Sequence, residues 1–201
     1  MRSSTVAGPP EPAWPVWRRR VTKLPTLAGG QLVLRPLGDQ DQSLYVALYG
    51  DAETMARAMP ALDAPSALRA FQRERKAQVE AGARRMAWTL SESSDGIAFG
   101  LLGLVLDDAG GAEVGVVLPP ARQGRRHATE AIALVAQHAF QTLALDRLYT
   151  RHAEGHGPAR GLMLRLGFEP APIGTPPHPV RWTLTRETWQ AAKRDKAGPF
   201  S

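Results

Sequence analysis

The segment from Glu113 to Ala131, EVGVVLPPARQGRRHATEA, limits what this chain can fold into more than any other stretch. An apolar run typical of a strand ends at Pro119 and Pro120, and a glycine-containing turn then leads into a helix expected to begin near His127. Backbone N–H groups gathered at such a helix N-terminus favour binding of a diphosphate. The turn also holds three cationic side chains, those of Arg122, Arg125 and Arg126. The segment therefore predicts a site for a phosphorylated ligand beside a strand.

Length and composition indicate one globular domain. The chain has 201 residues, 43% of them hydrophobic, which is enough for a packed core. It contains no cysteine, which excludes disulfides, thiolate zinc sites and cysteine nucleophiles and is compatible with a reducing compartment. No apolar run approaches the roughly 20 residues of a membrane span, and the first residues lack the apolar core of a signal peptide. We therefore expect a soluble, cytoplasmic protein with no membrane partner.

The formal net charge of +6 would attract any polyanion, so it does not by itself identify a partner. The basic residues are scattered along the chain, whereas a nucleic-acid-binding protein usually concentrates them on one face. Nucleic acid is therefore not an expected partner. No spacing of His, Asp and Glu resembles a metal site, so no metal is expected either.

The chain divides into three parts. Residues 1–28 form a Pro-rich extension that carries Trp14 and Trp17 beside a basic run, and its prolines argue against a helix or a central strand. The extension is expected either to pack over the domain through its tryptophans or to dock a partner. Residues 29–190 hold the periodic segments and are expected to form the domain, and residues 191–201 are assigned to a C-terminal tail.

Apolar periodicity and turn residues predict an α/β fold. Strands are expected at residues 31–37, 86–90, 98–106, 114–118, 147–153, 168–171 and 180–185, and helices at residues 39–49, 51–59, 66–81, 126–142, 158–166 and 186–194. This order gives a mixed central sheet of about six to seven strands with helices on both faces. The strands beginning at Val114 and Arg147 flank one helix, so they should be parallel neighbours.

Three blocks carry a resemblance to a known family: LVLRPL at residues 32–37, VGVVLPPARQGRRHATEAI at residues 114–132, and ARGLMLRLGFEP at residues 159–170. The GNAT superfamily of acyl-CoA N-acyltransferases has a pyrophosphate signature, Q/R-x-x-G-x-G/A, which falls here on residues 123–128. Over residues 31–189 the chain therefore resembles this superfamily. Within it, the chain looks like the branch that contains ribosomal-protein N-terminal acetyltransferases.

The chain departs from the family pattern at four positions. Arg126 stands where the signature has its central glycine, which lets the backbone approach the pyrophosphate closely. The arginine side chain either obstructs that approach or binds the phosphates itself. His156 and Ala159 occupy the family's Asn and Ser positions, and Met163 stands where many relatives have a tyrosine. The cofactor site is thus modified, and the usual hydroxyl acid is missing.

The resemblance implies acetyl transfer to an amine from acetyl-CoA, which serves as co-substrate without a metal. It also implies a splayed parallel strand pair at the cofactor site, where free N–H groups hold the pantetheine and the thioester. An amide of Val116 or Val117 would then stabilise the oxyanion. The residues expected to bind the cofactor are Val116, Val117, Leu118, Gln123, Gly124, Arg125, Arg126, His127, Ala128 and Thr129.

Two residues are expected to be catalytic by handling protons. Glu113 starts the splayed strand, where relatives sometimes keep a basic carboxylate, and His156 lies with His152 near the expected thioester. An α-amine with a pKa of roughly 7.7–8.0 needs less help to lose its proton than a lysine ε-amine at roughly 10.4. A thiol leaves with little help, so loss of the hydroxyl acid does not exclude activity.

Several acceptors and a second class of function stay open. The acceptor is a protein N-terminal α-amine or a small-molecule amine, acetylated by direct attack in a ternary complex. The departures at Arg126, His156 and Ala159 motivate the alternative, a non-catalytic module of the same fold that binds acyl-CoA or docks a protein. The sequence also leaves a homodimer open.

Overall fold

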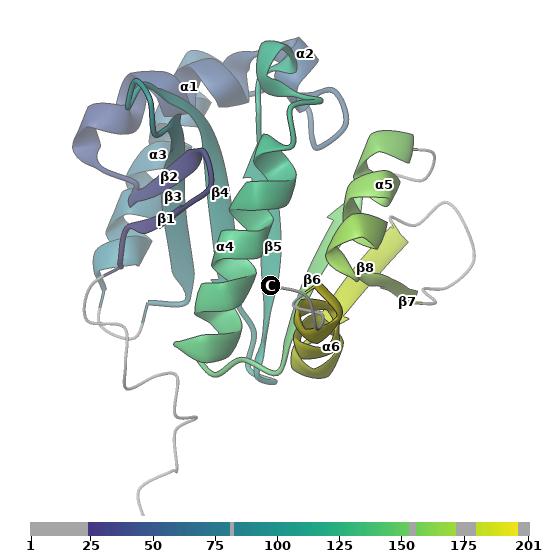
Figure 1. The fold of residues 1–201 in the computed structure, drawn as a ribbon. Helices are drawn as coiled ribbons and strands as arrows, with labels where there is room; N and C mark the ends of the chain where they lie inside the picture. The colour runs from purple at the N-terminus through teal and green to yellow at the C-terminus, as the bar shows by residue number, and fades with distance from the viewer. Residues whose placement is uncertain (1–23, 81–82, 153–155, 172–179, 197–201) are drawn as a thin grey trace, which may run out of the picture.

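The computed structural model describes residues 24–80, 83–152, 156–171 and 180–196 (Figure 1). Trp14 and Trp17, and with them the role expected for the N-terminal extension, lie outside the described residues. The strands are Leu27–Gly29 (β1), Leu32–Pro36 (β2), Arg85–Glu92 (β3), Ala98–Leu106 (β4), Gly111–Val117 (β5), Arg147–His152 (β6), Glu169–Ala171 (β7) and Val180–Thr185 (β8). They form one mixed sheet in the order β1-β2-β3-β4-β5-β6-β8-β7.

The sheet has eight strands, slightly more than the six to seven predicted. The additional strand is β1, whose three residues are too few to show the alternation that marks a strand in the sequence. It pairs antiparallel with β2 across a turn in which Gly30 has a φ of +58°. Just before it, the carbonyl oxygen of Pro25 accepts a hydrogen bond from Nε1 of the buried Trp88 at 2.9 Å. Two of the three residues of this edge strand, Leu27 and Ala28, therefore come from the range that the sequence pattern assigned to the extension.

Helices cover both faces of the sheet, as predicted. The helices are Gln42–Gly50 (α1), Ala52–Met55 (α2), Ala64–Val79 (α3), His127–Gln141 (α4), Gly157–Leu166 (α5) and Arg186–Lys196 (α6). Figure 1 shows α4 and α5 in front of the sheet and α1 and α3 behind it. Behind the sheet, Tyr45 of α1 and Phe71 of α3 belong to a small buried cluster. In front, α4, α5 and α6 contribute to the main core, which includes Val135, Met163 and Trp189.

Helix α4 holds the predicted phosphate-binding turn against the sheet. Its fully buried side chains recur at helical spacing: Ala131, Val135 and Ala139. Near its N-terminus, the carboxylate of Glu130 accepts hydrogen bonds from the backbone N–H groups of Gln31 at 2.7 Å and Leu32 at 3.0 Å. A Cβ on Gly30 would lie 2.4 Å from Oε1 of Glu130, so any other residue at position 30 would require the Glu130 carboxylate to shift. The start of α4 is therefore fixed to the β1–β2 turn.

The parallel pair of β5 and β6 splays, as expected from the resemblance. The two strands pair only at Gly111↔Arg147, Ala112↔Leu148 and Glu113↔Tyr149. β5 stays paired with β4 as far as Val117, while β6 runs on to His152 beside β8. The sheet therefore divides between β5 and β6 at the end where α4 and α5 begin (Figure 1).

Candidate active site

The turn between β5 and α4 depends on two residues with left-handed backbone conformation. Gly124 has a φ of +75°, and Arg126, which caps the N-terminus of α4, has a φ of +65°. A left-handed conformation costs a residue other than glycine roughly 1–2 kcal/mol. The sequence suggested one reason for glycine at position 126, which is close approach of the backbone to a phosphate. The left-handed backbone of Arg126 is a second reason.

The N-terminus of α4 presents backbone N–H groups without partners. The first four N–H groups of an α-helix have no acceptor within the helix; here they belong to Arg126, His127, Ala128 and Thr129. No side chain caps this end, and no backbone carbonyl of the described loops accepts from these four groups. Apart from its two chain neighbours, no described residue has an atom within 4 Å of the place where a Cβ on Gly124 would be. The turn thus offers open space and a partial positive charge to an anion.

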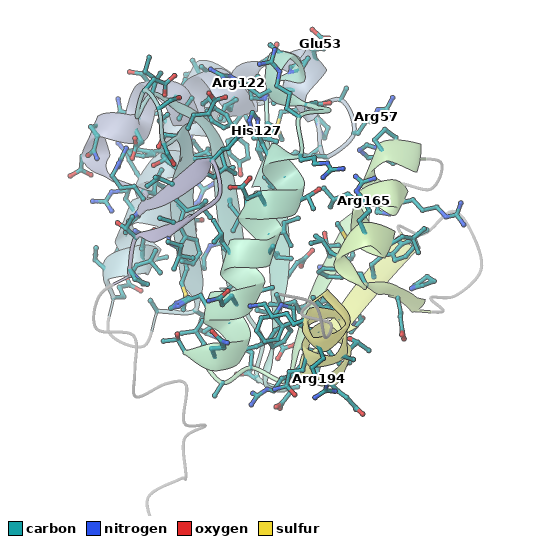
Figure 2. The ribbon with its side chains drawn as sticks, viewed as in Figure 1. Glu53, Arg57, Arg122, His127, Arg165 and Arg194 are labelled. Carbon is teal, nitrogen blue, oxygen red and sulfur yellow. The ribbon has the colours of Figure 1, made fainter. Side chains whose placement is uncertain are left out.

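One of the three turn arginines is directed inward rather than toward a ligand. Arg122 Nη1 donates to Oε1 of Glu92, at the end of β3, at 2.5 Å. His127 is only 4% exposed; its Nε2 lies 3.4 Å from the same carboxylate oxygen, and its Nδ1 lies 3.2 Å from the Arg122 carbonyl oxygen. Figure 2 shows Arg122 and His127 near the start of α4. Both side chains therefore support the turn from within, while Arg125 and Arg126 are exposed.

The other side chains predicted to bind the cofactor are mostly engaged within the protein. Gln123 Nε2 donates to the carbonyl oxygen of Leu118 at 3.0 Å, and Leu118 itself is buried. Val117 packs against the cluster behind the sheet, and Ala128 packs against the main core. The hydroxyl oxygen of Thr129 is buried without a hydrogen-bond partner in the described part of the chain. At this turn the backbone, rather than these side chains, faces the open space.

The pairing of β4 with β5 shows which backbone groups face the split. Asp107 N–H donates to the Gly111 carbonyl at 2.9 Å, and the register between the two strands is regular from there on. Hydrogen-bonded pairs alternate along an antiparallel ladder, so every second residue after Gly111 points its N–H and C=O groups toward β4. Val114 and Val116 therefore point theirs toward β6. Because Val116 lies beyond the last β5–β6 pair, the described strands leave its N–H unpaired.

The two residues predicted to be catalytic lie on either side of this split. The carboxylate of Glu113 accepts from Nε of Arg151 at 3.0 Å and from Nη2 at 2.5 Å. These hydrogen bonds and the charge of Glu113 raise the pKa of Arg151. On the other side, the β5–β6 register carried past Glu113 would set Val116 opposite His152, whose ring centroid lies 5.9 Å from that of His156.

The imidazole of His156 is held by an arginine from the far side of the split. Arg57 Nη1 lies 3.3 Å from Nδ1 of His156, and Figure 2 shows Arg57 beside the N-terminal end of α5. Burial lowers the pKa of His156, and the positive charge of Arg57 and the neighbouring His152 lower it further. A guanidinium only donates, so Nδ1 accepts and the neutral ring carries its proton on Nε2.

Three residues of this arrangement were missed from the sequence: Glu92, Arg57 and Arg151. They contact predicted residues that lie 30, 99 and 38 positions away along the chain. No local motif marks such partners, because only the folded sheet brings them together.

In the described ranges, no group of three or more His, Cys, Asp or Glu residues is placed to hold a metal ion. None of the described helices is long and apolar enough to cross a membrane.

A mixed sheet that splits beside an uncapped helix start is the architecture of acyltransferases that use coenzyme A thioesters. A family model described as an acetyltransferase (GNAT) domain matches residues 31–169, more than half of the chain. The chain therefore belongs to the GNAT acetyltransferase family, whose members use acetyl-CoA. Comparison with curated proteins returned no match.

Solved structures support the fold assignment. Spermidine N-acetyltransferase from Vibrio cholerae, in complex with CoA and spermine, matches with a TM-score of 0.67 and 18% identity over 81% of this chain and 99% of that one. A candidate ribosomal-protein-serine acetyltransferase from the same organism gives 0.67 and 18% over 80% and 97%. A nucleotide-linked sugar GNAT gives 0.71 and 15% over 86% and 96%. At these identities the likeness shows the fold alone, and the ribosomal-protein branch stays a prediction.

Proposed function

We propose that this protein is an N-acetyltransferase that moves the acetyl group of acetyl-CoA to a primary amine by direct attack in a ternary complex. One observation carries the proposal: the free N–H of Val116 at the split lies on the strand that leads into the uncapped N-terminus of α4. The N–H of Val116 would bind the thioester carbonyl, and the N-terminus of α4 would bind the pyrophosphate. Acetyl-CoA carries a thioester carbonyl and a pyrophosphate at the two ends of its pantetheine arm, so it fits this pair of sites.

The residues of the turn fit the phosphate end of acetyl-CoA. The N–H groups of residues 124–129 would bind the pyrophosphate, and the exposed Arg125 and Arg126 would add charge. The buried hydroxyl of Thr129 has an unused hydrogen-bonding capacity at the same helix turn. On β5, no described residue other than the two chain neighbours of Gly115 lies within 4 Å of the place where a Cβ on Gly115 would be, which would leave room along the strand for the pantetheine.

The reaction joins the amine nitrogen to the acetyl carbon and breaks the carbon–sulfur bond, so that CoA leaves as a thiolate. The N–H of Val116 would stabilise the oxyanion that forms during attack. We assign Glu113 as the acceptor of the amine proton, directly or through water, with Arg151 fixing its carboxylate. Neutral His156 would donate a hydrogen bond from Nε2, and it cannot act as a base through Nδ1 while Arg57 occupies that atom.

Binding and turnover can be tested separately. Acetyl-CoA at 100 times its Kd should stabilise the protein by about 2.7 kcal/mol, which is roughly 5–10 °C in Tm for a domain of this size. Thiol release should then require an amine, which we would screen among N-terminal peptides, amino acids, polyamines and aminoglycosides. Binding without thiol release would favour the non-catalytic module. No shift in Tm at millimolar acetyl-CoA would exclude both the acetyltransferase and the non-catalytic module that binds acyl-CoA.

The role of Glu113 predicts a specific loss. Glu113→Gln should lower kcat by about 100-fold or more, as expected when a general base is removed, and should leave the Kd of acetyl-CoA unchanged. Glu169→Gln is the matched control, because Glu169 is an exposed glutamate on β7 of the same sheet. Equal kcat in the parent and both variants would show that solvent alone accepts the proton.

A further inference from the structure

Two arginines that have no carboxylate partner among the described residues flank His156, Arg57 from the opposite side of the split and Arg160 from its own side. Arg57, between α2 and α3, contacts the ring, and Arg160 lies one helical turn further along α5, where its N–H donates to the His156 carbonyl at 3.0 Å. Both side chains are exposed, and neither forms an ion pair with the residues that the structure describes. By contrast, Arg122 and Arg151 at the same end of the sheet are each bound to a glutamate.

A cavity lies beside His156 and has Arg160, but not Arg57, in its wall. It has a volume of about 450 Å³, and its walls include His152, His156, Arg160 and Trp182. Trp182 is only 3% exposed, and its ring stacks on His152 with 6.0 Å between the ring centroids. Its indole Nε1 is buried without a hydrogen-bond partner in the described part of the chain. The walls thus combine an aromatic surface and a cation.

The charges at this place favour one kind of ligand. Guanidinium groups bind carboxylates and phosphates through paired N–H donors. Of the acidic groups on the sheet, Glu113 is neutralised by Arg151 through two hydrogen bonds, and Glu169 on β7 is an exposed glutamate beside Pro170 of the cavity wall. Glu53, also on the α2 side, lies at the top of the molecule in Figure 2, away from α5. Among the described side chains that contact or neighbour His156, Arg57 and Arg160 would repel a polycation and attract an anion.

We propose that the acceptor is an amine that also carries an anionic group, a carboxylate or a phosphate, which Arg57 and Arg160 bind beside His156. The inference rests on the proposed function, because it names the class of amine that the acetyltransferase uses. The site borders the split, since Arg57 contacts His156 and His156 neighbours His152, at the end of β6 where the strand has left β5. An acceptor anchored here presents its amine to the split.

Matched acceptor pairs test the inference. Phenylalanine and phenylalaninamide differ in one negative charge, phosphoethanolamine and ethanolamine differ in a phosphate, and spermidine represents the polycations. In the parent protein, kcat/KM should favour the anionic member of a pair by about 10-fold to 100-fold, the range for a hydrogen bond to a charged group. The pair that shows the larger ratio identifies the anion as carboxylate or phosphate.

Variants then assign the preference to the arginines. Arg57→Gln and Arg160→Gln should lower the ratio toward one mainly by raising KM for the anionic acceptor, and Arg57→Lys should restore part of it. Arg165→Gln is the control, because Arg165 lies on α5 outside the cavity walls and should leave the ratio unchanged. Thiol release that favours the neutral amide or spermidine would overturn this inference but not the proposed function. The same holds if Arg57→Gln lowers kcat/KM equally for anionic and neutral acceptors. No release with any amine would overturn the proposed function as well.

Discussion

Arg126 is the residue at which this chain departs most clearly from its family. Its left-handed backbone costs roughly 1–2 kcal/mol relative to glycine, and its guanidinium is exposed at the mouth of the phosphate-binding turn. We expect Arg126→Gly to raise the free energy of unfolding by about 0.5–1 kcal/mol, because the greater freedom of glycine in the unfolded chain offsets part of the relief. Urea unfolding measures this. Arg126→Ala keeps a Cβ and should show no gain, so equal stability of the two variants would contradict the argument.

The same two variants separate the possible effects of the Arg126 side chain on the cofactor. If the exposed guanidinium binds the phosphates, both variants should bind acetyl-CoA about 2-fold to 5-fold more weakly, the scale of an exposed charge pair. If the side chain obstructs the turn, Arg126→Gly should bind more tightly than the parent. We expect the first result, because Arg126 has no carboxylate partner in the described ranges to hold it away from a ligand. Calorimetric titration distinguishes the outcomes, and identical Kd values in all three proteins would exclude both effects.

At the scale of elements, the alternation along β5 makes neighbouring residues inequivalent. The N–H of Val116 points toward the split, whereas that of Val117 points toward β4. Val116→Pro should therefore lower kcat by about 100-fold to 1000-fold, as for loss of an oxyanion donor, while the protein still folds. Val117→Pro removes a ladder hydrogen bond and should instead lower the free energy of unfolding by about 1–3 kcal/mol. Unfolding curves and kcat for the pair decide this, and a folded Val116→Pro protein with parental kcat would contradict the geometry.

Helix α4 owes its position in part to one carboxylate. Glu130 accepts two backbone hydrogen bonds from the β1–β2 turn, and these bind the edge of the sheet to the helix that carries the cofactor turn. Glu130→Ala should lower the free energy of unfolding by about 1.5–3 kcal/mol, as expected for hydrogen bonds to a charged group. Glu130→Gln keeps one carbonyl oxygen as an acceptor and should lose less. A stability loss that is equal in both variants would show that charge, rather than hydrogen bonding, fixes the helix.

Across the whole molecule, the sequence predicted what depends on neighbours along the chain. The apolar stripe of α4 and the parallel pair of β5 and β6 follow from local patterns, and both are present. Contacts across the sheet were not predictable, because Glu92 and Arg57 reach their partners only after the strands pair. The choice between the amides of Val116 and Val117 also depends on register, which the sequence does not contain. The edge strand β1 was missed because three residues cannot display a period.

The stability of the whole fold should respond to mild acid through His138. This residue of α4 is 7% exposed, packs edge-on against Trp88 with 6.2 Å between the ring centroids, and leaves Nε2 without a partner in the described part of the chain. Burial lowers its pKa below the ordinary value of 6.5. Below about pH 6.5 the unfolded chain therefore binds a proton that the folded protein does not, so stability falls as the pH falls.

Replacing His138 with leucine should remove its part of that dependence. Between about pH 7 and pH 5, where histidines titrate, the free energy of unfolding should fall less steeply in His138→Leu than in the parent. A residual slope is expected from His156, whose pKa is also lowered, mainly by burial and further by Arg57 and His152. His156→Gln in the same background should flatten the curve further. If the free energy of unfolding, measured with urea, depends on pH equally in the parent and in His138→Leu, then the folded protein accommodates the protonated His138 ring without loss of stability.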